Sequence, residues 1–290
     1  MNTLGQKTGK INPHELTESR KQLHYAIQFI AATGNALAEP QPDYSHTSLG
    51  WNPELNVFVG SLIQGETSFQ VALDPVSLTS LILDEQGNKI AALPLHKKTL
   101  AEGLNWHKNQ ISKLGADASK IILLSYPPDD FPDHPVAHGT PFDASKESER
   151  SELAAYYANT YELLQEIIAI NEGISPIHIW PHHFDMATLI SLPGTKDGEE
   201  KTIGIGLSPG DTSYDEPYWY VTPYPYPKID EFPSLESNGF WHKRNWVGAV
   251  LTASNLAKNG TEKAQQNQVM SFLHSALNES KLLLQDAAYN

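Results

Sequence analysis

Two patterns of apolar residues alternate along this chain, and the first of them predicts helices. In these stretches apolar residues recur every three to four positions, which places them on one face of a helix. A proline or a glycine follows three of the stretches, and both residues commonly mark the end of a helix. The predicted helices cover residues 15–38, 99–114, 147–173, 238–258 and 261–287.

The second pattern is an alternation with a period of two, which predicts strands. Val57 and Val59 alternate with other residues, and so do Phe69, Val71 and Leu73. In a strand every second side chain points to the same face, and the glycines between such runs mark turns. We expect strands within residues 44–93, at 121–126 and within 177–221.

A set of landmarks recurs in the same order in the two halves of the chain and indicates an internal repeat. The distance from Pro75 to Trp106 is 31 residues, and that from Pro209 to Trp241 is 32. A chance match among aromatic and proline residues is the alternative. The paired landmarks are His24–Ala26 with Tyr156–Ala158, Trp51–Asn56 with Trp180–Asp185, Ala72–Pro75 with Gly206–Pro209, and Trp106–Lys108 with Trp241–Lys243.

The order of the predicted elements indicates the fold class. Runs of strands flanked by helices, without strict alternation of one strand and one helix, are typical of α+β proteins. We therefore predict an α+β fold of two pseudo-repeated units, each an antiparallel sheet flanked by helices. The predicted segments are an N-terminal tail (1–14), a first unit (15–126), a proline-rich connection (127–146), a second unit (147–258) and a C-terminal helix (259–290).

The amino-acid composition and net charge exclude some classes of binding partner. The chain has 290 residues, 40% of them hydrophobic and 19% charged, which is enough apolar material for a core. Its net charge of −14 and its lack of a basic cluster argue against a nucleic-acid partner. No segment has the length of a membrane span and no secretory signal is evident, so we expect a cytoplasmic protein without a membrane partner. No feature of the sequence indicates an oligomeric state.

Candidate chemistry is concentrated in the second predicted unit, around Trp180-Pro-His-His-Phe-Asp185. If this segment enters a strand, His183 and Asp185 share one face, with Cα atoms roughly 7 Å apart. An imidazole and a carboxylate at that separation can chelate a metal jointly, and the carboxylate can also orient the imidazole for general base catalysis. A structural hydrogen bond between the two is the alternative.

A second carboxylate follows a predicted turn at Ser208-Pro-Gly-Asp211. Proline presets φ at the second turn position and glycine takes a positive φ at the third, so Asp211 is placed at a sharp bend. We predict that His183, Asp185 and Asp211 form a catalytic set. We predict that aromatic residues line the adjacent substrate cleft, namely Trp180, Tyr218, Trp219 and Tyr220.

One metal-binding alternative uses a later histidine. His183, Asp185 and His242 follow the order of the two-histidine, one-carboxylate triad of non-haem iron enzymes, so a divalent metal is a candidate cofactor. Against this, the chain has no downstream arginine where a 2-oxoglutarate carboxylate would need one. His242 also lies in a predicted helix rather than in a barrel strand.

Three short motifs together resemble the signature of an uncharacterised family of bacterial and plant proteins. They are Trp180-Pro-His-His-Phe-Asp185, Ser208-Pro-Gly-Asp211 and Pro217-Tyr-Trp-Tyr-Val221. The resemblance is densest over residues 178–250, and the chain carries His182 where the family more often has Glu. The family has no established activity, so the resemblance implies no mechanism.

Two hypotheses for function follow from the sequence. In the first, the protein is an enzyme for a small molecule, with the His/Asp site in its second unit and with or without a metal. In the second, it is a non-catalytic binding module for a small molecule or a protein, and the same His/Asp cluster is structural. The sequence contains no phosphate-binding loop, no dinucleotide-binding glycine motif and no nucleophile elbow, which would have indicated a particular reaction.

Overall fold

The computed structural model describes residues 6–127, 130–256 and 260–285. Two antiparallel sheets, of five and six strands, and the helices beside them make an α+β fold, as predicted. Contacts within the chain define two compact units. Their described residues are 15–127, 130–154 and 178–184 in one, named here the α1 unit, and 6–14, 155–177, 185–256 and 260–285 in the other, named the α5 unit.

The sheet of the α1 unit is a simple meander, in which each strand pairs with the next along the chain. Val57, Ala72 and Leu83 form an apolar cluster on one face of this sheet. Val71 and Leu73, which alternate in the sequence, point to the opposite face from Ala72 and are also buried, so both faces of their strand are covered. The strands are β1 (Gly50–Asn52), β2 (Val57–Val59), β3 (Gln70–Asp74), β4 (Thr79–Leu83) and β5 (Lys89–Pro94).

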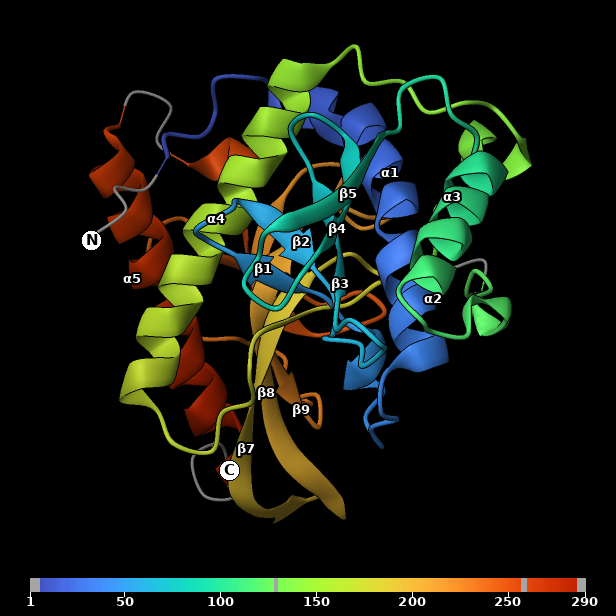
Figure 1. Ribbon diagram of the computed structural model, residues 1–290. Coiled ribbons are helices and arrows are strands. Elements are labelled where there is room, and N and C mark those ends of the chain that lie inside the picture. The colour runs from blue at the N-terminus through green and yellow to red at the C-terminus, as the bar shows by residue number, and fades with distance from the viewer. Residues whose placement is uncertain (1–5, 128–129, 257–259, 286–290) are drawn as a thin grey trace. The chain divides into compact units, whose positions relative to one another are not determined.

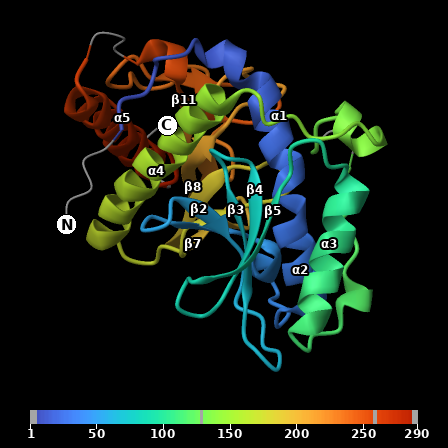
Figure 2. The ribbon, with the colours of Figure 1, turned by 45° about the horizontal axis from the view of Figure 1, so that its top comes forward.

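Three helices accompany this sheet: α1 (Thr17–Ala26), α2 (Gln28–Leu37) and α3 (Leu100–Lys113). The single helix predicted at 15–38 is thus divided at Ile27, where the side-chain amide of Gln28 donates to the carbonyl of His24. A capping box between Thr99 and Glu102 starts α3. Helix α2 packs against β3, and α3 packs against α2 and β5, so the two helices lie side by side (Figures 1 and 2).

The predicted strand at 121–126 is not formed, because this stretch has no ladder partner among the described residues. Several contacts hold the following proline-rich segment against α1, among them two that involve polar side chains of the helix. The hydroxyl of Tyr25 donates to the carbonyl of Pro132 at 2.8 Å, and the ring of buried His134 lies 3.1 Å from the carboxylate of Glu18.

Short 3-10 helices also occur in the described residues. They are η1 (Pro13–Leu16), η2 (Ser45–Thr47), η3 (Ala118–Lys120), η4 (Pro135–His138) and η5 (Ala253–Asn255).

The α5 unit contains five strands of the second sheet, in the order β10-β11-β9-β8-β7. Its strands β7 and β8 form a long hairpin that is plain in Figure 1. Helix α5 packs against β8, β9 and β11. The elements are β7 (Met186–Lys196), β8 (Glu199–Ser208), β9 (Tyr218–Tyr224), β10 (Phe240–His242), β11 (Gly248–Thr252) and α5 (Glu262–Leu283). The sixth strand, β6 (His178–Ile179), belongs to the α1 unit, and α4 (Glu147–Ile170) enters the α5 unit at Ala155.

The predicted helix at 238–258 is wrong, since residues 240–255 of this segment form β10, β11 and η5, while 257 and 258 lie outside the described residues. All five residues of β11 are buried, and a short apolar run buried on both faces has no period that separates a strand from a helix. Trp106 consequently lies in a helix and Trp241 in a strand, so this pair of landmarks is not structurally equivalent.

No helix in the part of the chain that the structure describes combines the length and the apolar character needed to cross a membrane.

Candidate functional site

Strand β9 presents two tyrosines on one face of the sheet in the α5 unit. The ring centroids of Tyr218 and Tyr220 are 6.2 Å apart, as expected for side chains two positions apart on a strand. Trp219 points to the opposite face, where its indole N–H donates to the hydroxyl of Thr160 at 2.9 Å and its ring packs beside Tyr156. Trp219 therefore belongs to the core and does not line a cleft with the tyrosines.

Tyr220 reaches across the neighbouring strand to a carboxylate. Its hydroxyl donates to Oδ2 of Asp185 at 2.5 Å, although Asp185 lies beside β7 and the two strands are separated by β8. Gly206 of β8 is the direct partner of Tyr220, and a Cβ atom there would come within 2.9 Å of the phenol oxygen and 2.3 Å of the carbonyl oxygen of Met186. The missing side chain of Gly206 thus opens the path between the phenol and the carboxylate.

Tyr218 makes the second phenol–carboxylate pair. Its hydroxyl donates to Oδ2 of Asp211 at 2.6 Å. The other carboxylate oxygen, Oδ1, accepts from the backbone N–H groups of Ser213 at 2.6 Å and Tyr214 at 3.1 Å. Asp211 therefore has the structural role of an aspartate that closes a turn and also a side-chain partner on the sheet.

A histidine and two further aromatic rings continue this polar chain. Nδ1 of His242 lies 2.8 Å from the hydroxyl of Tyr214, and Nε2 lies 2.5 Å from the carbonyl oxygen of Arg244. Because a carbonyl oxygen only accepts, Nε2 carries the proton, and in the neutral ring Nδ1 accepts from the phenol. The indole of Trp246 stacks on His242 at 4.3 Å and lies nearly parallel to the ring of Tyr218.

The environment keeps the phenols of this group protonated. Burial, reinforced by the neighbouring Asp185 carboxylate, raises the pKa of Tyr220 well above its ordinary value. Burial and the Asp211 carboxylate raise the pKa of Tyr218 and, to a smaller degree, that of Tyr214. The two carboxylates are therefore held next to hydrogen-bond donors that do not ionise at neutral pH.

The segment that carries His182 and His183 is a turn and not a strand. Phe184 takes a positive φ of 59°, and β7 starts only at Met186, so the alternation of faces assumed for His183 and Asp185 does not apply. His183 belongs to the α1 unit, where its Nε2 lies 4.0 Å from a carboxylate oxygen of Asp130. Beside it, burial lowers the pKa of His182 to about 4, and the neighbouring His183 adds to the shift.

The predicted site residues are thus divided between the two units. His183 and Trp180 are in the α1 unit, where the Trp180 ring lies 5.4 Å from that of His178. The α5 unit holds the rest of the predicted set, and within it the structure joins Asp185 to Tyr220 and Asp211 to Tyr218 by hydrogen bonds.

The predicted metal triad of His183, Asp185 and His242 is not assembled. Within residues 6–127, 130–256 and 260–285, no group of three or more His, Cys, Asp or Glu residues could hold a metal ion. The physical reason is local: β10 directs His242 to Tyr214 and to a backbone carbonyl, and these occupy both of its ring nitrogens.

Three residues of this site are not among those that the sequence patterns predict for it, namely Gly206, Tyr214 and Trp246. For Gly206 there is a signal, because a glycine inside a strand often marks a close approach of another group. Tyr214 and Trp246 lie in connecting segments, and no periodicity distinguishes them from other loop residues.

Comparison of the chain with protein-family models, with curated proteins and with solved structures finds no match in any of the three.

Proposed function

We propose that the protein is an enzyme that acts on a small polar molecule by proton transfer at the α5 unit. The observation that carries the proposal is the pair of short phenol–carboxylate hydrogen bonds, Tyr220 to Asp185 and Tyr218 to Asp211, on one side of β9. In this proposal the carboxylates are the general bases. The two phenols stay protonated. They donate hydrogen bonds to the carboxylate before the proton transfer and to the negatively charged oxygen of the substrate after it.

The residues around the pairs suggest the class of substrate. An ionised carboxylate accepts from a hydroxyl or an amine, and the flat rings of Tyr214 and Trp246 offer faces for the body of such a molecule. Tyr214, Asp211 and Trp246 are each partly accessible to solvent, so an incoming group can reach them. A hydroxylated or amino-bearing small molecule fits these groups better than an anion does.

A non-catalytic role is the second candidate, and a specific observation favours it. The polar groups of the network already satisfy one another: Asp211 accepts three hydrogen bonds, and both ring nitrogens of His242 have partners. Such a closed network is also what a purely structural link between the strand and its loops would look like.

Ligand-detected NMR with a panel of monosaccharides, polyols and small amines tests the proposal, followed by a time course on each compound that binds. We expect wild type to bind and convert at least one compound. Asp185→Asn and Asp211→Asn should abolish conversion, and the matched control Asp230→Asn, at an exposed carboxylate outside the network, should not.

Two outcomes would contradict enzymatic function at this site. One is that compounds are converted at equal rates by wild type and by both Asn variants. The other is that neither wild type nor the variants bind any compound of the panel, while the Asn variants lose thermal stability relative to Asp230→Asn. The second outcome supports the structural role. Circular dichroism of every variant shows whether a loss of activity is only a loss of folding.

A further inference from the structure

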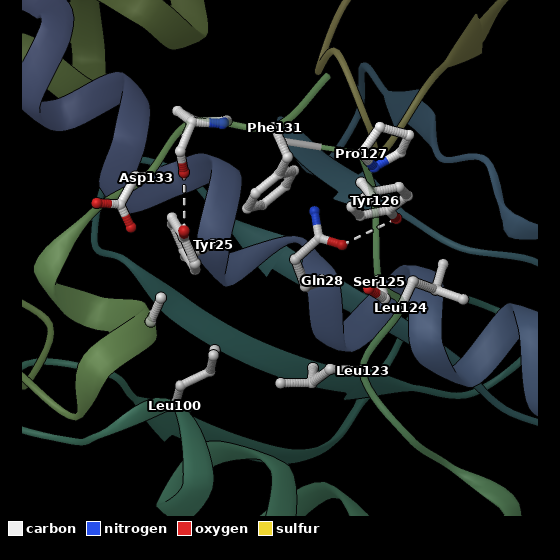
Figure 3. Close-up of a pocket in the computed structure, with 12 residues that line it drawn as sticks. Tyr25, Gln28, Leu100, Leu123, Leu124, Ser125, Tyr126, Pro127, Phe131 and Asp133 are labelled. Carbon is white, nitrogen blue, oxygen red and sulfur yellow. Dashed lines mark hydrogen bonds between the residues drawn. The ribbon is translucent and has the colours of Figure 1, made fainter. Parts of the chain in front are cut away.

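A pocket of ≈ 490 Å³ lies in the α1 unit, in a part of the chain to which neither the sequence motifs nor the proposed function assign a role. Helices α1 and α2 supply Tyr25 and Gln28, the start of α3 supplies Leu100, and the unpaired stretch 123–127 and the loop 131–137 form the other sides (Figure 3). Its volume lies in the range of pockets that hold small organic ligands, about 300–1,000 Å³.

The lining is mainly apolar. Leu100 and Leu123 lie at one end of the pocket in Figure 3, and Phe131 projects between Tyr25 and Tyr126. The ring of Phe131 stacks on that of Tyr126 at 5.2 Å and meets the ring of Tyr25 edge to face at 4.9 Å. The aromatic wall is therefore held by its own ring contacts and does not depend on a ligand for its shape.

Most polar side chains of the lining already donate their hydrogen bonds to acceptors within the protein. Tyr25 donates to the carbonyl of Pro132 at 2.8 Å, and Tyr126 donates to the side-chain oxygen of Gln28 at 3.0 Å. The amide nitrogen of Gln28 donates to the carbonyls of His24 and Pro181. Burial raises the pKa of both tyrosines, so their oxygens remain neutral acceptors.

The one charged residue of the described lining is a carboxylate at its exposed edge, Asp133, whose side chain is 86% exposed. No lysine or arginine is among the residues that line the pocket, whereas Asp133 is. A hydrogen bond from His138 holds the pKa of Asp133 below its usual value, so this carboxylate is ionised at neutral pH. A ligand here meets phenol oxygens and a carboxylate, which accept hydrogen bonds, and the side-chain hydroxyl of Ser125 as a donor.

We propose that this pocket binds a small amine whose apolar body, aromatic or aliphatic, lies among Leu100, Leu123 and Phe131 and whose ammonium group faces Asp133. The apolar walls account for the body, and the surplus of side-chain acceptors over side-chain donors accounts for the amine. A carboxylate or phosphate ligand would find no cation in the lining and would be repelled by Asp133.

Three matched probes test the proposal by titration calorimetry or by NMR of the full-length protein: 2-phenylethylamine, 2-phenylethanol and 3-phenylpropanoate. We expect the amine to bind best, the alcohol more weakly and the carboxylate not at all. The proposal is overturned if the amine shows no saturable binding up to its solubility limit, or if the carboxylate binds as tightly as the amine.

Two variants locate the binding. Ala137→Trp fills the pocket from an exposed position in η4, and we expect it to weaken amine binding by more than about tenfold. Ala92→Trp, at an exposed position of β5 outside the pocket, is its control.

Asp133→Asn should weaken binding of the amine by about threefold, make that binding less dependent on salt, and leave binding of the alcohol unchanged. Its control is Asp130→Asn, which does not line the pocket.

Equal affinity of Ala137→Trp and wild type for the amine, with both proteins folded, would place the amine elsewhere and refute the assignment. Loss of amine binding in Ala92→Trp as well as in Ala137→Trp would do the same, because the effect would then not be specific to the pocket. Neither result bears on the carboxylates of β9 and its neighbours, so this inference stands or falls independently of the proposed enzymatic function.

Discussion

The hydroxyl of Tyr220 donates to the carboxylate of Asp185 over 2.5 Å, across a strand in which the intervening residue is a glycine. The two residues are 35 positions apart in the chain. The contact exists because Gly206 presents no side chain between them. One small residue on β8 thus decides whether a phenol and a carboxylate on either side of it can pair. Substitution of Gly206 is therefore the most direct test of this contact.

Gly206→Ala should destabilise the α5 unit, whereas Gly204→Ala on the same strand should not. A Cβ at Gly206 would meet a backbone oxygen at 2.3 Å, which cannot move without shifting β7, while one at Gly204 meets nothing within 4 Å. Overpacking of this kind costs roughly 1–3 kcal/mol. Urea unfolding of both variants measures it, and equal midpoints for the two would show that the space at Gly206 is not needed.

Tyr218→Phe should lower the free energy of unfolding by about 1.5–3 kcal/mol, because it removes a hydrogen bond to a charged acceptor. Tyr218 is 4% exposed, so its buried hydroxyl depends on Asp211 for a hydrogen-bond partner. Tyr224→Phe, at an exposed tyrosine of the same strand, should change it by less than about 0.5 kcal/mol. A Tyr218→Phe protein as stable as Tyr224→Phe would mean that the bond contributes nothing net.

Stability should fall as the pH is lowered from 6.5 towards 3, and His24 should contribute to this fall. Burial lowers the pKa of His24 to about 3 from an ordinary value of 6.5, so over this range the unfolded chain binds a proton that the folded chain does not. The neutral ring contributes its stability above pH 6.5 and loses it progressively below. Urea midpoints measured across this range show the dependence.

His24→Gln retains a side-chain amide that can donate to the carbonyl of Pro181, but it does not titrate. We expect a shallower loss of stability with falling pH than in wild type. His274→Gln, at an exposed position of α5, should leave the pH dependence as it is. If His24→Gln and wild type lose stability in parallel, His24 does not cause the effect.

His242 should be found in one tautomer, protonated on Nε2, at pH values where its ring is neutral. The carbonyl of Arg244 requires a donor at Nε2, and the phenol of Tyr214 supplies one to Nδ1. Long-range proton–nitrogen NMR correlations on labelled protein distinguish the two nitrogens. In Tyr214→Phe the Nδ1 signal should shift most, and an Nδ1-protonated ring in wild type would contradict the geometry.

Patterns within single segments predicted much of the fold. Thr99 and Glu102 form the capping box that starts a predicted helix, and Tyr218 and Tyr220 share a face of a strand, because both features depend only on the local backbone. The prediction is wrong where burial on both faces removes the period, as in β11, whose five residues are all buried and lie within a predicted helix. It also failed at Phe184, whose positive φ breaks the alternation on which the pairing of His183 with Asp185 depended.

The sequence by itself determined the fold class, most of the helices and the presence of reactive carboxylates beside an aromatic strand, since spacing and turn residues act over a few positions. Only the tertiary structure decided the partners. Asp185 pairs with Tyr220 through the space left by Gly206, and His183 lies in the other unit beside Asp130. The reason is that such contacts are set by strand register and by packing between segments distant in the chain, which no local pattern records.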